Sequence, residues 1–542
     1  MFQRILLSLL GALLLFIAVL LWNRHGLGAP CVRNMDRAYT HLSVQMAERC
    51  EAFEGAFSHA GFRHPGPALF YYLAATTQVL EIFLSRDDGF RIAILALNCL
   101  SVGLSIFLLS GLTPHRTYSL LLAPIAFIVI SPRALFDYWN PYPIPAATAA
   151  YLLTLVYIAY GRLWYLPLAT GLASFIAQCH LSTPPFLGLT ALYAVGACVW
   201  RRRHTVERYH SVLKPVLVSI LVAAILWLGP LYDLAVYGFD SNLMVIARRF
   251  LEEHHTSTVR RSFGMVWELA AKKLSLFFHP LNSWRRLLPL LLLGVAVLTT
   301  PRRGAFFHVR MLVFLSWLIT VWALSKSFNP LADYLVSYFL GVLILLLTVA
   351  LMSLSDLTGS AFSRLSLFKE DSCRLAVSVL ALGAVLFSAA YDPEVGLPQK
   401  KDPCAVSRVA EQFAQALDIQ AGTLYSVTPA TMELRSFSVQ FALQMLRLGA
   451  NICFDDQWEH YVGRALTCEY HNRFIPSERT VAVELSIIGG RPRRRFGVVA
   501  PQPAAAVPSR RLIRMDWIDT QGSPHSFEHV LTSSRESPQP ND

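Results

Sequence analysis

Apolar runs close to the length of a membrane-spanning helix recur along most of this chain. A helix needs about 20 mainly apolar residues to cross a bilayer core of roughly 30 Å, and the first run, Ile5–Trp22, approaches that length. The other runs are Phe90–Leu112, Tyr118–Ile130, Pro145–Tyr160, Leu163–Gln178, Pro184–Trp200, Pro215–Leu234, Leu287–Thr299, Met311–Leu324, Leu331–Met352 and Leu375–Ala390. Each should be helical, because a lipid-exposed backbone must satisfy its own hydrogen bonds. The pattern predicts an all-α polytopic membrane protein with about eleven transmembrane helices.

Two apolar segments need a separate interpretation. Ile5–Trp22 could be a cleaved signal peptide, but no small-x-small cleavage site follows it, so we expect a retained anchor. Pro67–Leu84 follows a Pro-Gly-Pro break and ends in acidic residues. That pattern favours a helix that lies at the membrane interface or re-enters the membrane.

Basic residues orient the spans, because cytoplasmic loops carry an excess of Lys and Arg. With a cytoplasmic N-terminus and alternating spans, the basic clusters at 201–203, 302–303 and 369–374 are all cytoplasmic. The first outer loop is then 23–89, and a long basic outer loop is 235–286. We expect a multi-pass protein of a bacterial-type plasma (inner) membrane.

The chain changes character after Ala390, where it becomes polar and rich in turn residues. Val406–Leu417 and Ser436–Leu448 have helical periodicity, and Thr480–Ile488 alternates like a strand. The expected organisation is a transmembrane domain at 1–391 and a small extracytoplasmic α/β domain at 392–500. A loose or disordered tail rich in Pro, Ala and Ser is expected at 501–542.

Composition supports a membrane class and narrows the partners. The chain is 54% hydrophobic and 15% charged, with a mean hydropathy of +0.45, whereas a soluble protein carries about a quarter charged residues. The net charge of +12 could indicate nucleic acid binding. Basic loop residues that orient the helices and contact anionic membrane lipid explain it better, so we expect no nucleic acid partner.

The nine cysteines divide by expected compartment. Cys31 and Cys50 share the first outer loop, while Cys404, Cys453 and Cys468 share the tail. An oxidising compartment allows a Cys31–Cys50 disulfide and one disulfide among the three tail cysteines, whose pairing stays open. No Cys-x-x-Cys or clustered His spacing is present, so a zinc site is not expected.

The first candidate for acid–base chemistry lies directly after the first span, in Arg33-Asn34-Met35-Asp36-Arg37. Asp36 would lie near the membrane surface, where a carboxylate can take a proton from a hydroxyl group. Arg37 beside it is a candidate contact for a bound substrate. The structural alternative is that Asp36 caps a helix that begins at Arg37.

Three other acids of the same loop compete with Asp36 for this role: Glu48, Glu51 and Glu54. Their spacing of three residues places them on one helical face. A solvated helical face is the simpler interpretation of the trio.

A turn signal follows in His64-Pro65-Gly66-Pro67, because Pro fixes φ and disfavours helix in the residue before it. His64 could bind a phosphate or an acceptor, or it could only cap the following helix. The sequence leaves these two roles open.

Three shorter polar and aromatic signals lie at predicted outer helix ends. They contain Asp137, Trp139 and Asn140 in Phe-Asp-Tyr-Trp-Asn-Pro, His180 in Gln-Cys-His-Leu-Ser, and Asp233 in Trp-Leu-Gly-Pro-Leu-Tyr-Asp. Singly, such residues are usually membrane anchors. Together, on one side of the membrane, they resemble the rim of a pocket.

The basic outer loop supplies candidate cations: Arg248, Arg260 and Lys272. Arg can hold a phosphate through two parallel hydrogen bonds. The alternative is an amphipathic helix that lies on anionic headgroups.

The order of first helix, acidic loop, His-Pro-x-Pro and aromatic helix resembles the opening of GT-C membrane glycosyltransferases, which use lipid-phosphate sugars as donors. The His-Pro-Gly-Pro turn and the three polar and aromatic signals resemble the motifs of a bacterial GT-C-like subgroup that includes the aminoarabinose transferases. The chain is also similar to protein mannosyltransferases. The likeness covers roughly the first 250 residues. Two positions depart from it: Gly229 stands where a second proline is expected, and Met35 stands where metal-dependent relatives have an acid. We therefore expect no cofactor and do not favour a divalent metal.

The resemblance implies a glycosyltransferase that moves a sugar from a polyprenyl-phosphate donor to a cell-envelope glycan, lipid or protein on the outer face. Asp36 would be the general base, and a single in-line displacement would invert the sugar carbon. The implied substrate-binding set is Arg37, His64, Asp137, Trp139, Asn140, His180, Asp233, Arg248, Arg260 and Lys272.

Two other functions remain open from the sequence. A transporter or flippase of a lipid-linked glycan precursor would explain the spans, but it predicts charges inside them, and the spans here are nearly free of charge. A non-catalytic GT-C-like assembly partner is also compatible, because a fold does not fix a function.

Overall fold

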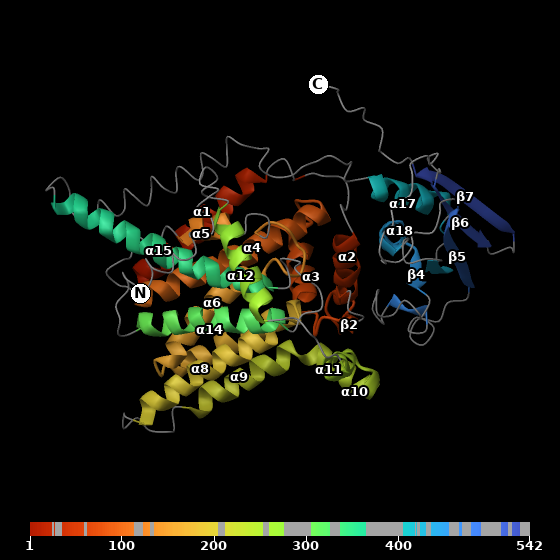
Figure 1. The fold of residues 1–542 in the computed structure, drawn as a ribbon. Helices are drawn as coiled ribbons and strands as arrows, with labels where there is room; N and C mark the ends of the chain where they lie inside the picture. Colours follow the sequence, from red (N-terminus) through yellow and green to blue (C-terminus); the bar gives the residue numbers. More distant parts are fainter. Residues whose placement is uncertain are drawn as a thin grey trace. The chain divides into compact units, whose positions relative to one another are not determined.

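The computed structural model describes residues 1–23, 27, 35–58, 62–112, 123–130, 135–203, 212–252, 259–275, 305–325, 336–364, 405–417, 419, 423–429, 435–454, 466–468, 479–488, 511–518 and 523–531. The chain forms two units (Figure 1). The first comprises Met1–Gly28, Ala52–Ala56 and His64–Gly396, and the second comprises Ala29–Glu51, Phe57–Arg63 and Leu397–Asp542.

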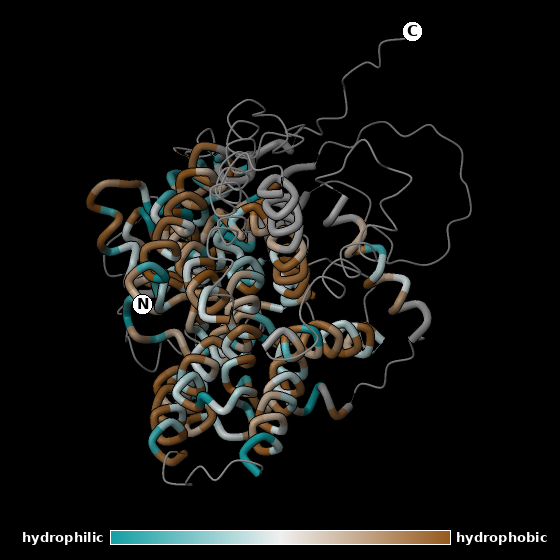
Figure 2. Tube along the Cα trace, turned by 90° about the vertical axis from the view of Figure 1, so that its left-hand side faces the viewer, coloured by the Kyte–Doolittle hydropathy of each residue, from teal (hydrophilic) through white to brown (hydrophobic). Residues whose placement is uncertain are grey.

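The described part of the first unit is helical. Its elements are α1 (Phe2–Trp22), α3 (Ala68–Leu80), α4 (Arg86–Leu112), α5 (Ala123–Ile130), α6 (Ile144–Ala159), η4 (Leu163–Tyr165), α7 (Leu166–Cys179), α8 (Pro184–Arg203), α9 (Leu213–Leu226), α10 (Leu228–Tyr237), η6 (Gly238–Asp240), α11 (Asn242–Glu252), α12 (Val259–Ser275), α14 (Ala305–Ser325) and α15 (Ser337–Arg364). Figure 2 shows hydrophobic residues along most of these helices.

Helix α6 forms the centre of the first unit. It is buried along its whole length and packs against α4, α7, α8 and α15. Its contact with α15 is close, because a Cβ atom added at Gly341 would lie 2.5 Å from the Pro145 carbonyl oxygen. Small residues let helix backbones approach in this way inside membranes.

Three described helical segments are long and apolar enough to cross a membrane: Phe2–Leu21, Arg86–Leu112 and Phe307–Ser325. Helices α9 and α10, bent by 62°, would make a fourth if they form one broken span. Shorter apolar helices cover Ala68–Leu80, Ile144–Ala159, Leu163–Cys179 and Ser337–Met352. The expected runs at 287–299 and 375–390 lie outside the described residues, so the count of about eleven spans stays a prediction.

Several predicted helices differ in their bounds from the observed ones, and two of these differences bear on the candidate site. The run Pro215–Leu234 is divided at Trp227, where α9 ends and α10 begins. Helix α4 begins at Arg86 rather than Phe90, because the Ser85 hydroxyl oxygen accepts a hydrogen bond from the Asp88 N–H (3.3 Å) and caps the first turn.

The second unit combines helices with a five-stranded sheet. Its elements are α2 (Met35–Glu48), β1 (Phe57–Ser58), β2 (Phe62–Arg63), α17 (Ala405–Ala416), β3 (Thr423–Pro429), α18 (Arg435–Arg447), β4 (Asn451–Phe454), β5 (Arg479–Ile488), β6 (Arg511–Ile518) and β7 (Pro524–Leu531). The strand order is β4-β3-β5-β6-β7. Strand β3 is parallel to β4 and β5, and β6 is antiparallel to β5 and β7. The predicted helices and strand of this region match α17, α18 and β5 to within one residue at every end.

The second unit contains two parts of the chain that the sequence analysis places elsewhere. Strands β6 and β7 lie within 501–542, where the sequence predicts a loose tail. The strands form beyond the Pro- and Ala-rich run, and Ile513 and Met515 of β6 are buried. Helix α2, from the first outer loop, packs against α18. The unit is therefore larger than the expected domain of 392–500.

The cysteines of the second unit are partly as expected. Cys453 and Cys468 form a disulfide, which resolves the open pairing in the tail for these two residues. Cys50 is an exposed free thiol, so the disulfide allowed between Cys31 and Cys50 is not formed. Cys50 also has a positive φ of 61°, at the end of α2.

Candidate functional site

The His-Pro-Gly-Pro turn is fastened to distant parts of the first unit. His64 is buried, and its Nδ1 atom accepts a hydrogen bond from the Leu181 N–H (3.2 Å). Its carbonyl oxygen accepts from the Gly55 N–H (2.8 Å) and from Asn242 Nδ2 (3.2 Å). The turn therefore joins the C-terminal end of α7 to the start of α11.

The two predicted histidines meet. The rings of His64 and His180 lie 4.5 Å apart between centroids. Nδ1 of His180 lies 2.8 Å from the Ser182 hydroxyl and accepts from the Ser182 N–H (3.3 Å). A ring nitrogen that accepts a backbone N–H carries no proton, so in both rings the proton lies on Nε2. Burial lowers the pKa of His180 to about 4, which favours this neutral form.

Gln178, which precedes His180 by two residues, links three elements. Its Oε1 atom accepts from the Ala68 N–H at the start of α3 (3.1 Å), and its Nε2 atom donates to the Leu226 carbonyl at the end of α9 (2.7 Å). The amide lies directly over Gly66, since a Cβ atom there would come 2.3 Å from Oε1. Glycine at 66 therefore leaves the space that this link needs.

The Trp-Asn-Pro segment joins the same region. Asn140 is buried, and its Nδ2 atom donates to the Cys179 carbonyl (2.7 Å). Trp139 packs edge-on against Tyr142 at 5.3 Å between ring centroids. Asp137 and Trp139 are half-buried, in contrast to the buried Asn140.

The last motif completes the arrangement. Asp233 is buried in α10, and its Oδ2 atom accepts from the Asn242 N–H at the start of α11 (2.8 Å). We call the six buried residues that connect these elements the polar junction: His64, Asn140, Gln178, His180, Asp233 and Asn242. It brings together residues from all four sequence motifs, including four of the predicted substrate-binding residues.

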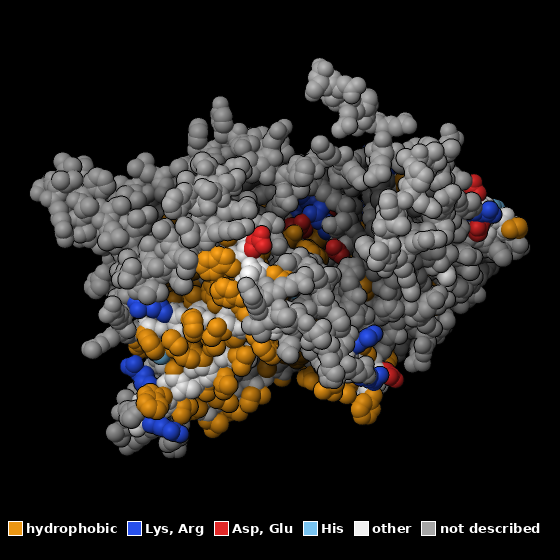
Figure 3. Space-filling model, viewed as in Figure 1, with side chains coloured by type: hydrophobic (Ala, Val, Ile, Leu, Met, Phe, Trp, Pro, Cys, Tyr) orange, Lys and Arg blue, Asp and Glu red, His pale blue; other side chains and the backbone are white. Residues whose placement is uncertain are grey.

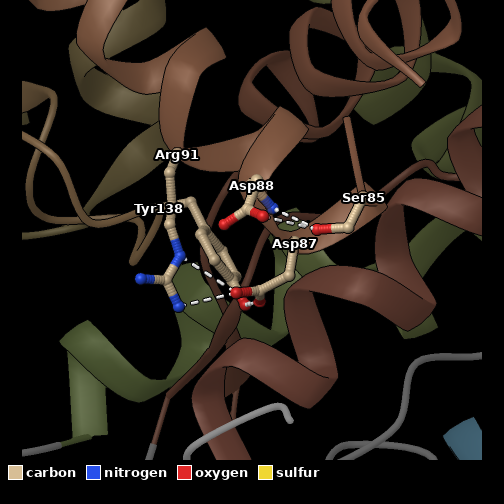
Figure 4. Close-up of polar contacts among 5 residues, drawn as sticks. All are labelled: Ser85, Asp87, Asp88, Arg91 and Tyr138. Carbon is tan, nitrogen blue, oxygen red and sulfur yellow. Dashed lines mark hydrogen bonds and ion pairs between the residues drawn. The ribbon is translucent and has the colours of Figure 1, made fainter. Parts of the chain in front are cut away.

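A second set of polar residues, all buried except Ser85, gathers around the start of α4 (Figure 4). Asp87 Oδ2 accepts hydrogen bonds from Arg91 Nη2 (2.6 Å) and Nε (2.9 Å), and the Tyr138 hydroxyl donates to Asp87 Oδ1. The Ser85 hydroxyl donates to Asp88 Oδ2 (2.8 Å). We call these five residues the Asp87 cluster.

The segment 135–140 connects the two sets of residues. Tyr138 contacts Asp87 on α4, the Leu135 carbonyl accepts from Asn98 Nδ2 on α4 (3.3 Å), and Asn140 bonds to the end of α7. Ionisable residues buried at the end of a membrane helix are costly and usually functional. The Asp87 cluster therefore belongs to the candidate site.

The other predicted residues lie elsewhere. Asp36 and Arg37, both half-buried, lie in the first turn of α2 in the second unit, where the Asp36 carbonyl oxygen accepts from the Thr40 hydroxyl (2.9 Å). Arg248 is exposed on α11 and donates to the Phe239 carbonyl (3.0 Å). Arg260 and Lys272 lie in α12.

The prediction that Glu48, Glu51 and Glu54 share one helical face is wrong. Helix α2 ends at Glu48, and Glu51 and Glu54 lie beyond it, because the chain turns at Cys50 with positive φ. Burial raises the pKa of the Glu51 carboxyl, and the nearby Arg49 partly opposes this effect.

The sequence patterns do not single out the Asp87 cluster. Its signal was present in Ser85-Arg86-Asp87-Asp88, because Ser followed by an acid three residues later is a helix N-terminus pattern, and Asp87 and Arg91 are four residues apart. Gln178 precedes the predicted residue His180 by two positions, and Asn242 follows the predicted residue Asp233 by nine positions. Among the described residues, no group of three or more His, Cys, Asp or Glu residues could hold a metal ion.

Comparison with solved structures identifies the fold. The chain resembles the crystal structure of ArnT from Cupriavidus metallidurans in the apo state, with a TM-score of 0.51 and 13% identity over 89% of this chain and 92% of that one. The fold is GT-C-like. A second ArnT structure, bound to undecaprenyl phosphate, matches with a TM-score of 0.48, 12% identity and the same coverage. The sequence matches no protein-family model and no curated protein.

Proposed function

We propose that this protein is a membrane glycosyltransferase that transfers a sugar from a polyprenyl-phosphate donor to an acceptor of the cell envelope. The observation that carries the proposal is the GT-C-like fold, shared with apo ArnT over 89% of the chain. The sequence order of first helix, acidic loop and His-Pro-Gly-Pro is an independent support.

The proposed reaction is a single displacement. Asp36 takes the proton of an acceptor hydroxyl, the acceptor oxygen forms a bond to the anomeric carbon, and the bond from that carbon to the phosphate oxygen breaks. The electron pair leaves with the polyprenyl phosphate, and the sugar carbon inverts. Positive charge or hydrogen-bond donors must stabilise the leaving phosphate.

The contacts of the polar junction suggest how its members contribute. Asn140 and Asp233 bond to backbone groups, so their role is to fix the ends of α7, α10 and α11. His64 and His180 carry their proton on Nε2, and a neutral N–H is a donor suited to phosphate or sugar oxygens. Half-buried Asp137 and Trp139 are the proposed sugar contacts of the 135–140 segment.

Glu51 is the alternative base. It also belongs to the second unit, and a raised carboxyl pKa makes a stronger base once the proton is lost. Asp87 is less suited, because its oxygens already accept hydrogen bonds from Arg91 and Tyr138.

The proposed location is a plasma membrane, with the second unit outside the cytoplasm. The Cys453–Cys468 disulfide supports an oxidising compartment for that unit. The three arginines at the end of α8, Arg201, Arg202 and Arg203, support a cytoplasmic end of that helix.

The test is sugar transfer from a panel of radiolabelled polyprenyl-phosphate sugars in membranes that contain the wild-type chain, Asp36→Asn, Glu51→Gln or Asp240→Asn. Asp240 is exposed on η6 and serves as the acid control. We expect transfer to be lost in Asp36→Asn by a factor on the order of 10² to 10⁴ and kept in Asp240→Asn, with all four proteins inserted equally.

The other outcomes separate the alternatives. Loss in Glu51→Gln with transfer kept in Asp36→Asn would move the base to Glu51. Transport of the labelled lipid across the membrane without transfer would favour a flippase. Absence of both activities with every donor would favour a non-catalytic assembly partner.

A further inference from the structure

Helix α10 turns its apolar side outward and its polar side inward. Its exposed large hydrophobic side chains, continued by η6, are Leu228, Leu231, Tyr232, Val236 and Phe239. Leu228, Tyr232, Val236 and Phe239 recur at intervals of three or four residues, which is the spacing of one helix face, and Leu231 lies at the edge of that face. On the opposite side, Pro230 and Asp233 are buried. An outward apolar face and an inward acid are the reverse of the pattern of a water-exposed helix.

The geometry of α10 suits a membrane surface. Its 10 residues span about 15 Å, half of a bilayer core of roughly 30 Å. It is bent by 62° from α9, whose own exposed side chains include Leu217, Leu221 and Ile225. The apolar surface therefore continues from α9 onto α10 and changes direction there.

Exposed cations lie at the end of the apolar face. Arg248 and Arg249 of α11 are exposed, and Arg248 Nη2 donates to the Phe239 carbonyl (3.0 Å). This bond holds one guanidinium beside the last apolar residue of the series. Figure 3 shows hydrophobic and basic side chains together over α10 and α11, with one acidic side chain among them, and Asp240 is exposed in this turn.

The polar junction holds this surface in place. Asp233 accepts from the Asn242 N–H at the start of α11 (2.8 Å), and Asn242 Nδ2 donates to the His64 carbonyl (3.2 Å). Phe53 packs against Tyr232 at 4.9 Å between ring centroids. The angle between α10 and α11 is thus fixed by buried bonds, so the cations and the apolar face keep their spacing.

We propose that α10, η6 and α11 form a membrane-surface site for anionic lipid headgroups. The apolar face of α10 enters the boundary between headgroups and acyl chains, and Arg248 and Arg249 bind headgroup phosphates. In this proposal Arg248 binds the headgroup of bulk anionic lipid of the phosphatidylglycerol type rather than the phosphate of the sugar donor. It does not depend on the proposed function.

The test replaces Phe239 with the photo-crosslinking residue benzoylphenylalanine. The full-length protein is placed, one copy per disc, in nanodiscs of equal phosphatidylglycerol and phosphatidylcholine, irradiated, and analysed by mass spectrometry. We expect lipid adducts in which phosphatidylglycerol exceeds phosphatidylcholine several-fold, since one basic residue near a surface favours anionic lipid by roughly fivefold.

Matched variants locate the preference. R248Q/R249Q should bring the adduct ratio close to one, and R248K/R249K should keep it well above one because both charges remain. R203Q/K214Q removes two exposed cations on α8 and α9 and should leave the ratio unchanged. Lipid adducts without a headgroup preference in the wild-type chain, or no lipid adducts in single-copy discs, would overturn the proposal. Protein adducts that appear only when two copies share a disc would show instead that a second copy covers this surface.

Discussion

At the scale of single residues, the buried polar groups of the first unit are mostly committed to backbone partners. Asn140, Gln178 and Asp233 each hold the end of a helix, while Asp87 is paired with Arg91. These residues shape the candidate site by fixing the loops around it. Their substitution should therefore lower the stability of the fold rather than act directly on the chemical step.

His180 gives a pH prediction. Its folded-state pKa of about 4 lies below the ordinary value of 6.5, so the unfolded chain binds the proton first as the pH falls. The stabilisation is complete above pH 6.5 and decreases between pH 6.5 and 4 by up to about 3 kcal/mol. Thermal unfolding of the detergent-solubilised protein should show this slope, and His180→Gln should flatten it. Equal slopes in both proteins would contradict the prediction.

The Asp87 cluster gives a second prediction. Asp87→Asn removes the counter-charge of the buried Arg91 guanidinium, which should cost about 3–5 kcal/mol. The matched control is Asp240→Asn, at an exposed carboxylate, for which the cost should stay within about 0.5 kcal/mol. Thermal unfolding of both variants checks the difference, and equal stabilities would show that the pair is not buried as described.

At the scale of elements, the side-chain hydrogen bonds that connect the helices of the candidate site lie at the helix ends. Gln178 ties the start of α3 to the end of α9, and Asp233 ties α10 to α11. At the break between α9 and α10, the Leu226 carbonyl oxygen thus accepts a hydrogen bond from Gln178 Nε2. This bond supports the division of the predicted single span into two helices.

Two glycines test this connection. Gly66→Ala would place a Cβ atom 2.3 Å from Gln178 Oε1, so the amide would have to move and lose its two hydrogen bonds, at about 1 kcal/mol or more for each. Gly229→Ala is the matched control, because its Cβ atom would lie 3.4 Å from the nearest atom, in Pro67. We expect a lower unfolding temperature for Gly66→Ala alone. A similar loss in Gly229→Ala would contradict the account.

Sequence patterns predicted elements well and their connections poorly. Periodicity identified α17, α18 and β5 to within one residue at every end, because local apolar spacing determines such elements. It missed β6 and β7, because β6 joins the sheet by pairing with β5 across the Pro- and Ala-rich run, and it missed Asp87, whose role depends on Tyr138 from another segment. The motifs around His64, Asn140, His180 and Asp233 were found as separate signals, and only the fold shows their contacts.

At the scale of the whole molecule, the chain has a GT-C-like fold and divides into a helical unit and an α/β unit that also contains α2. The candidate base Asp36 therefore belongs to the second unit, and the polar junction belongs to the first. The anionic-lipid site on α10 and α11 concerns the first unit alone.

The most direct test of the central claim is release of undecaprenyl phosphate from synthetic undecaprenyl-phosphate sugars by the purified full-length protein in nanodiscs, measured together with sugar incorporation into an envelope extract. Nucleotide sugars serve as the non-lipid donor control. We predict equal amounts of lipid phosphate released and sugar transferred, with neither from nucleotide sugars nor from the Asp36→Asn protein. Transfer from a nucleotide sugar, or no release from any lipid-linked donor, would contradict the account.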